Sequence, residues 1–143
     1  MSTAFATVVG ALVSTLAAGP AVSAQIHRVR LRPMAQAWTT AVVVRPLGVE
    51  LQDAVGQGVA CVWTTSVAIE CYARATPGVT ADVAVDAVLQ AVTTRLLANR
   101  SLGGTVGDLA LAAITYDFDT DAEATACVTL TYQVRHATAA NTV

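Results

Sequence analysis

The two histidines are the residues of this 143-residue chain best suited to acid–base chemistry at neutral pH. His27 stands in a run of alternating arginines, and His136 stands close to the C-terminal end. A histidine acts as a general acid or base when a carboxylate or a nucleophile lies within hydrogen-bond reach. Neither histidine has such a partner nearby in the sequence, and we assign both to solvent-facing roles. Because no acid, base and nucleophile set emerges, we do not expect an enzyme.

A run of acidic residues, DFDTDAE, is the second candidate for chemistry. It places Asp117, Asp119 and Asp121 at alternate positions, as at the start of a calcium-binding loop. The rest of that loop is missing, because Ala122 stands where the sharp turn needs glycine and Val128 stands where a bidentate glutamate is needed. We interpret the run as an acidic hairpin tip that faces solvent or contacts a partner. An adventitious cation site is the alternative.

Other motifs for cofactors or metals are absent from the sequence. The glycine-rich LGGTVG follows a predicted helix instead of beginning one, so it is no phosphate loop. The three cysteines, Cys61, Cys71 and Cys127, lack CxxC spacing and predict neither a disulfide framework nor a zinc site. Cysteine is often a small buried residue, and we expect reduced thiols here. We therefore expect no cofactor and no resident metal.

The segment HRVRLR complements the acidic run. In an extended strand Arg28, Arg30 and Arg32 point to one face about 7 Å apart, while Val29 and Leu31 point inward. Such a stripe of charge can keep an edge strand soluble. It can also dock the carboxylates or phosphates of a partner. A cationic stripe and an acidic tip on one chain could join copies head to tail, and such contacts close into rings when the rotation permits.

Composition limits the classes of partner. Ten acidic and eight basic residues give a net charge of -2, which argues against the basic surface that phosphate binding needs, so we expect no sequence-specific nucleic acid. Hydrophobic residues make up 55% of the chain and charged residues only 13%. Soluble monomers rarely expose large apolar patches, so this balance indicates surface buried against another chain. We expect a homo-oligomer.

The opening residues predict a helix over residues 3–18 that belongs to the folded protein. Their large apolar side chains recur at three- and four-residue steps, and Gly19 and Pro20 provide a stop. A secretory signal cleaved after Ala24 is the alternative, but such a signal normally carries Lys or Arg before its apolar part, and none precedes Arg28. A membrane span is not expected, because Gly10 and several hydroxyl residues interrupt the apolar run.

The remaining elements predict one domain over residues 1–143. Strands and a turn-rich loop, Gly48 to Gly58, fill residues 24–73, with strands expected to end at Pro33 and Pro46. A helix over 80–99 and a hairpin over 108–136 follow. The expected fold class is α+β, a mostly antiparallel mixed sheet with two helices packed on one face. The candidate core residues are Trp63, Ile69, Leu89, Leu96 and Leu130.

The second half of the chain resembles a known family. The string VWTTSVAIECYAR, a Pro-Gly turn, the helix ADVAVDAVLQAVTTRLL, then SLGG, a strand, an acidic turn and ACVTLTYQVRH follow one another over residues 60–137. This succession is similar to that of the tail terminator proteins of long-tailed bacteriophages, of the minor tail protein U type. The resemblance implies an α/β fold and a hexameric ring that caps the tail tube, stops its polymerisation and provides the docking surface for the head connector.

The same resemblance implies the partners and the location. The partners would be further copies of the chain, the tail tube protein and the head-tail connector protein, in a virion tail assembled in the bacterial host cytoplasm. Family members contact the tube largely through long loops, so Glu50, Gln52, Asp53 and Gln57 are the candidate tube-facing residues. Arg28, Arg30, Arg32, Asp117, Asp119 and Asp121 are the candidate subunit or partner interface. Another head-tail joining or tail-tube-like component, or a small secreted binding domain, remains the alternative.

Overall fold

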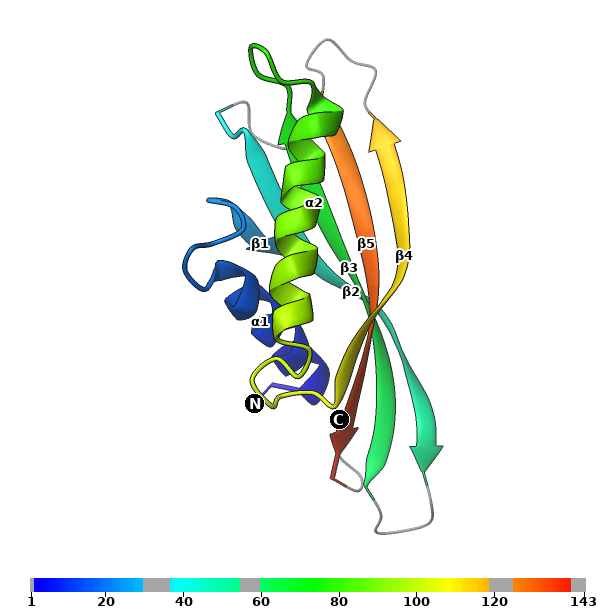
Figure 1. The fold of residues 1–143 in the computed structure, drawn as a ribbon. Helices are drawn as coiled ribbons and strands as arrows, with labels where there is room; N and C mark the ends of the chain where they lie inside the picture. Colours follow the sequence, from blue (N-terminus) through cyan, green and yellow to red (C-terminus); the bar gives the residue numbers. More distant parts are fainter. Residues whose placement is uncertain (1, 30–36, 55–59, 119–124, 140–143) are drawn as a thin grey trace.

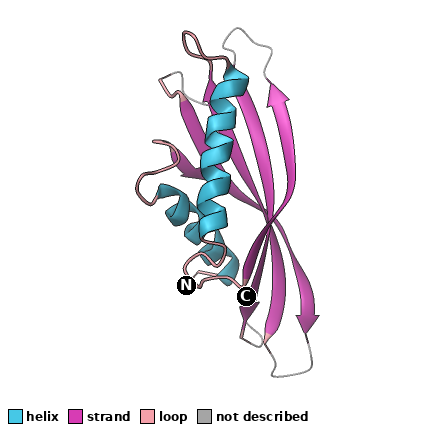
Figure 2. Ribbon diagram, viewed as in Figure 1, coloured by secondary structure: helices cyan, strands magenta, loops and turns pink. Residues whose placement is uncertain are grey.

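Two helices cover one face of a five-stranded sheet (Figures 1 and 2). The computed structural model describes residues 2–29, 37–54, 60–118 and 125–139. The elements are α1 (Ala4–Ala17), β1 (Ile26–Arg28), β2 (Thr40–Ala54), β3 (Cys61–Arg74), α2 (Ala81–Ala98), β4 (Asp108–Phe118) and β5 (Thr125–Thr138). The strand order is β1-β2-β3-β5-β4, parallel between β1 and β2 and antiparallel elsewhere. The predicted α+β class is confirmed. We call the side that carries α1 and α2 the helix-bearing face.

The helix α1 is an integral part of the packed structure. Thr3 caps its start, because the Thr3 hydroxyl accepts a hydrogen bond from the Ala6 N–H at 3.2 Å. The apolar stripe predicted from the sequence faces inward, and its buried residues are Val8, Val9, Leu12 and Leu16. The chain leaves the helix at Ala18, just before Gly19 and Pro20. The helix predicted for residues 3–18 is therefore confirmed.

The helix α2 lies over β3 and β5 and is tied to the end of α1. Its inward stripe is Val85, Val88, Leu89, Val92 and Leu96. Asp82 lies in the first turn, where a hydrogen bond from the Thr80 hydroxyl is the main cause of its lowered pKa, and a negative charge suits the helix N-terminus. In the last turn the Arg95 guanidinium donates to the carbonyls of Thr15, Ala18 and Pro20. One side chain thereby joins the C-terminal turns of both helices.

The strands β3 and β5 form the middle of the sheet and alternate as predicted. Thr65, Val67, Ile69 and Cys71 of β3 are fully buried on the helix-bearing face. Across the pairing, β5 places Ala126, Val128, Leu130, Tyr132 and Val134 on the same face, all buried. β4 pairs antiparallel with β5, which confirms the predicted hairpin. Leu89, Leu96 and Leu130 also belong to the core cluster.

The prediction for β1 and its basic stripe is wrong where it can be checked. The strand ends at Arg28, because Val29 has a φ of 48°, in the left-handed region that extended strands do not use. Val29 is 51% exposed and does not point inward. Arg30, Leu31 and Arg32 lie outside the described residues.

The prediction of a loop from Gly48 to Gly58 is also wrong over its first half. β2 continues past Pro46 to Ala54 and pairs with β3 down to Ala54↔Cys61. Among the described residues β1 pairs only with residues 42–44, so no described strand flanks Pro46 on the side away from β3, where its missing N–H costs no ladder hydrogen bond. Two register shifts, between Pro46 and Gly48 and between Leu51 and Asp53, keep the strand paired.

The solvent-facing roles predicted for the histidines are wrong. His136 is 5% exposed, its Nε2 lies 2.7 Å from the Thr65 hydroxyl, and its ring meets that of Phe5 at 5.5 Å. His27 is half-buried and stacks on Trp38 at 5.0 Å.

Trp63, expected in the core, is half-buried and lies beside the same Phe5 ring that contacts His136. It packs edge-on against Phe5 at 5.3 Å, and its Nε1 donates to the Thr138 hydroxyl at 2.9 Å. These contacts dock the first turn of α1 on the sheet.

Candidate functional site

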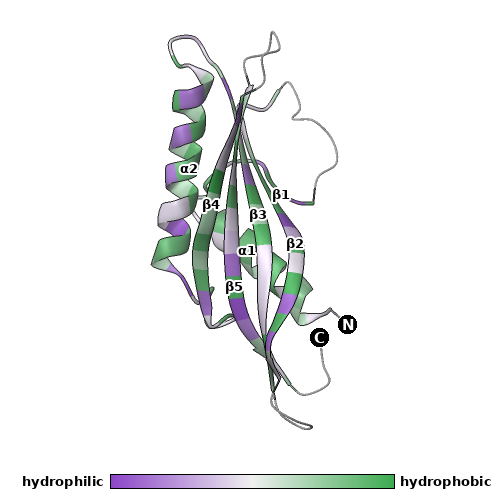
Figure 3. Ribbon diagram, turned by 90° about the vertical axis from the view of Figure 1, so that its right-hand side faces the viewer, coloured by the Kyte–Doolittle hydropathy of each residue, from purple (hydrophilic) through white to green (hydrophobic). Residues whose placement is uncertain are grey.

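The outer strand β4 carries a row of exposed apolar side chains. Leu111, Ile114, Tyr116 and Phe118 are 44%, 43%, 54% and 51% exposed, and we call them the β4 row. Their partners in β5 are Tyr132, Leu130, Val128 and Ala126, so they lie on the helix-bearing face. They remain exposed because α2 packs over β3 and β5 and not over β4. Figure 3 shows the apolar colouring of β4 along the sheet edge.

The edge formed by β4 lacks the usual protection against association. No charged residue and no proline occurs between Asp108 and Asp117, and only one irregularity, between Leu111 and Ala113, interrupts the strand. Proteins normally blunt a free sheet edge with charges, prolines or bulges, because unpaired backbone groups attract other strands. Among the described residues no strand lies on the outer side of β4. Residues 109–116 therefore form an exposed, uncharged stretch of this sheet edge.

A groove between α2 and β4 extends the same surface. It encloses about 320 Å³ and is lined by Thr93, Leu96, Leu97, Arg100, Leu109, Ala110, Leu111 and Tyr132. Leu97 is 72% exposed, the most exposed large hydrophobic side chain described. An ion pair of 2.9 Å between Arg100 and Asp108 lies at the end of α2 and the start of β4. The lining suits an apolar side chain from a partner protein better than a polar small molecule.

A second apolar row lies on the same face near the opposite edge of the sheet, on the distal half of β2. Leu47, Val49 and Leu51 are 49%, 36% and 49% exposed, and we call them the β2 row. Val49 pairs with Thr65 and Leu51 pairs with Trp63, which places both on the helix-bearing face. β3 and β5 separate the β2 row from the β4 row. The chain thus has two apolar surfaces, one near each edge of its sheet.

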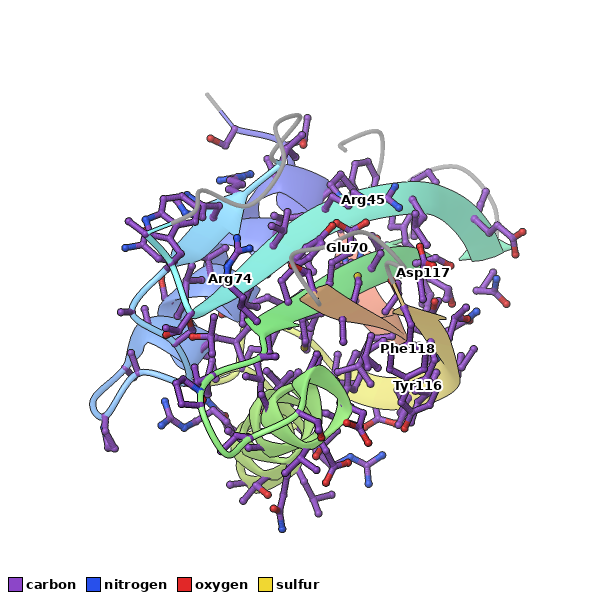
Figure 4. The ribbon with its side chains drawn as sticks, turned by 90° about the horizontal axis from the view of Figure 1, so that it is seen from above. Arg45, Glu70, Arg74, Tyr116, Asp117 and Phe118 are labelled. Carbon is purple, nitrogen blue, oxygen red and sulfur yellow. The ribbon has the colours of Figure 1, made fainter. Side chains whose placement is uncertain are left out.

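The face of the sheet without helices carries a fixed polar network. Arg45 of β2 donates through Nε to Glu70 at 2.8 Å, and the Tyr72 hydroxyl donates to the other Glu70 oxygen at 2.8 Å (Figure 4). Burial, followed by the hydrogen bond to Glu70, raises the pKa of Tyr72 well above its ordinary value. The phenol therefore stays a neutral donor. This arrangement orients Arg45.

The residues predicted as an interface lie in separate places. Arg28 donates through Nη2 to the Ala6 carbonyl at 2.8 Å, so it joins β1 to α1. Asp117 lies exposed near the end of β4, at the other edge of the sheet (Figure 4). Arg30, Arg32, Asp119 and Asp121 lie outside the described residues.

The residues predicted to face the tube belong to β2. Glu50 and Gln52 are exposed on its distal half, and Asp53 lies at its end opposite Val62, while Gln57 lies outside the described residues. Glu50, Gln52 and Asp53 do not lie next to Arg28, which pairs at Val44, or next to Asp117, which pairs with Cys127 of β5.

Sequence reasoning missed the two apolar rows. The signal for the β4 row is LALAAITY, a run of eight residues without charge in the first strand of the predicted C-terminal hairpin. The sequence hides the β2 row, because Pro46 predicts the end of a strand before it.

Two further properties of the described residues bear on function. No cluster of three or more His, Cys, Asp or Glu side chains with metal-binding geometry occurs within residues 2–29, 37–54, 60–118 and 125–139. Neither α1 nor α2 has the length and hydropathy needed to cross a membrane.

Comparison with known proteins gives a likeness of fold. No protein-family model and no curated protein matches the chain. Among solved structures, the fold is similar to a chain of the "Virion of native gene transfer agent (GTA) particle". The TM-score is 0.65 at 15% sequence identity, over 96% of this chain and 100% of that chain. At this identity the likeness establishes the shared fold.

Proposed function

We propose that this protein is a structural component of a phage-type virion. It forms a hexameric ring that caps the tail tube, stops tube polymerisation and offers the docking surface for the head connector. The observation that carries the proposal is the fold shared with a gene transfer agent virion chain over nearly the whole length of both chains. The resemblance of residues 60–137 to tail terminator proteins supports the same class and adds the ring and the tube.

The surface chemistry supports a ring. A closed ring needs two different contact surfaces on each copy, because every copy meets its two neighbours through opposite sides. The β4 row and the β2 row are two such surfaces, on one face and near opposite edges of the sheet. The frame for both is a sheet whose middle strand β3 is fully buried on the helix-bearing face from Thr65 to Cys71.

The proposed role requires no catalysis. The chain works by binding, and its partners are further copies of itself, the tail tube protein and the head-tail connector protein. Glu50, Gln52 and Asp53, at the distal end of β2, remain the candidate contacts with the tube, now as part of a strand that projects beyond β1. The location is the virion tail, with assembly in the cytoplasm of the bacterial host.

The experiment that tests this function is tube growth in the presence of the protein. Purified tail tube protein is polymerised with and without the chain, and tube lengths are measured by negative-stain electron microscopy. We expect shorter tubes with a ring at one end, and native mass spectrometry should give six copies of the 14.7 kDa protomer per ring. Copies spread along the whole tube would instead identify a tube-like component. Unchanged tubes without bound protein would contradict the proposal.

A further inference from the structure

We propose that β4 of one copy lies antiparallel along the outer edge of β2 of a second copy, with Asp117 opposite Arg45. This contact rests on the proposed function, because it supplies the joint between neighbouring copies of the ring. It joins the β4 row of one copy to the β2 row of the next.

The occupant of the β4 edge is a second copy because the chain itself carries the matching surface. Both rows lie near opposite edges of one sheet, and Val49 and Leu51 share the helix-bearing face with the β4 row. An aromatic side chain buries about 150 to 250 Å² when fully covered, so the half-exposed β4 row offers roughly 300 to 400 Å². The β4 row thus supplies about half of the area of roughly 800 Å² that a stable interface buries on each partner. The groove between α2 and β4 adds area next to the row.

The strand directions determine the geometry. β2, β3, β5 and β4 alternate in direction across the sheet. A second copy placed beside β4 in the same orientation therefore presents β2 antiparallel to β4. This orientation brings the end of β4 to the start of the free part of β2.

Charge complementarity sets the register. Asp117 is exposed near the end of β4, and the side chain of Arg45 is 43% exposed at the point where β2 passes beyond β1. The ion pair with Glu70 engages Nε of Arg45 and holds the guanidinium on the face without helices. Asp117 lies on that same face, because its neighbour Tyr116 belongs to the β4 row. Opposite charges on the same face of facing strands attract each other.

From this pair, three members of the β4 row match apolar residues of β2 in order, while Phe118, one step in the other direction, comes to the end of β1, which pairs with β2 at Val44. Following each ladder away from Asp117 and Arg45 brings Tyr116 beside Pro46, Ile114 beside Val49 and Leu111 beside Leu51. A shift by one residue would turn every apolar side chain of one row toward the polar face of the other strand. Pro46 offers no N–H, so the side chains carry the contact at this point and no continuous backbone ladder is required.

The first test uses two variants that each destroy one surface. Tyr116→Arg removes the β4 surface and Leu51→Arg removes the β2 surface, and both replace exposed residues, so the monomers should keep their melting temperatures. We expect each variant alone to be monomeric by native mass spectrometry. An equimolar mixture should give one-to-one pairs and nothing larger, because each variant keeps one intact surface. Val79→Arg, a change at a residue that is 39% exposed and outside both rows, is the matched control and should assemble like the wild type.

Two results of this test would overturn the contact. A Leu51→Arg variant that assembles normally, beside a Tyr116→Arg variant that does not, would mean that β4 meets another surface. A wild-type chain that stays monomeric at every accessible concentration would mean that the rows do not join copies.

The second test reads the register by disulfide formation. In a background with Cys61→Ser and Cys127→Ser, Asp117→Cys in one copy is mixed with Arg45→Cys in another and oxidised. We expect a cross-linked pair, and no cross-link when Glu50→Cys replaces Arg45→Cys, since residue 50 lies four ladder steps away, about 13 Å. A cross-link to residue 50 but not 45, or between two Asp117→Cys copies, would overturn the register.

The contact and the proposed function can fail separately. A chain that assembles through both rows but leaves tube growth unchanged would contradict the function alone. A Leu51→Arg variant that still forms rings and caps tubes would contradict the contact alone.

Discussion

Leu12→Ala tests whether α1 is part of the core, and Leu97→Ala provides a matched control. Leu12 is 0% exposed among the buried residues of α1, whereas Leu97 is 72% exposed on α2. Replacing a buried leucine by alanine removes the transfer free energy of the side chain and leaves a cavity, at a cost of about 2 to 5 kcal/mol. The same change on the surface alters stability by no more than about 0.5 kcal/mol. The free energy of unfolding of a domain is about 5 to 15 kcal/mol, so the first loss is large.

The assay is urea unfolding followed by far-ultraviolet circular dichroism, with both variants compared with the wild type at one protein concentration. The midpoint should fall clearly for Leu12→Ala and stay close to the wild type for Leu97→Ala. Deleting residues 2–24 extends the test, because it removes the four buried apolar side chains of α1, which contribute about 1.5 to 3 kcal/mol each. We expect this truncated chain to lose cooperative unfolding. Equal effects of the two leucine variants, or a truncated chain that still unfolds cooperatively, would refute the placement of α1 in the core.

Two further predictions concern His136 and Trp63, whose rings both contact Phe5 in the first turn of α1. Burial lowers the pKa of His136 from its ordinary value of 6.5, so the unfolded chain takes up a proton first as the pH falls. The free energy of unfolding should be constant above the ordinary pKa of 6.5, where the imidazole is neutral in both states, and should decrease as the pH drops below it. His136→Gln should reduce this decrease, and an identical pH profile would contradict the burial of a neutral imidazole. Trp63→Phe removes the hydrogen bond to Thr138 and should cost about 1 kcal/mol in urea unfolding. Trp63→Ala also loses the contact with Phe5, yet should cost less than the about 3 to 5 kcal/mol of a fully buried aromatic ring, and a larger loss would show that Trp63 is a core residue.

Elements whose signal is local were predicted well from the sequence. α1 and α2 have apolar residues at helical spacing, and β3 and β5 alternate between a buried and a polar face, so each pattern identifies its own element. The hairpin of β4 and β5 follows from two adjacent strands joined by a short connection.

Features that depend on neighbouring elements were not predicted. Pro46 predicts the end of a strand. In the described part of the chain β1 pairs with β2 only as far as Val44, so Pro46 can stand in the continuing strand without the loss of a ladder hydrogen bond. His136 reads as part of a polar tail, and only the placement of Phe5 over the end of β5 buries it. The exposure of the β4 row likewise depends on where α2 lies, which periodicity within β4 does not encode.

The position of β3 in the middle of the sheet has a consequence for the timing of folding. One neighbour of β3 is β2, which is made before it, but the other is β5, the last strand described, which pairs with β3 from Arg74↔Thr125 to Cys61↔Thr138. Long-range pairings of this kind form slowly, because a large loop must close before any contact is gained. A chain still emerging from the ribosome therefore lacks the strand that completes its core. The sheet can therefore be completed only after β5 has been synthesised, and until then β3 has one of its two long edges unpaired.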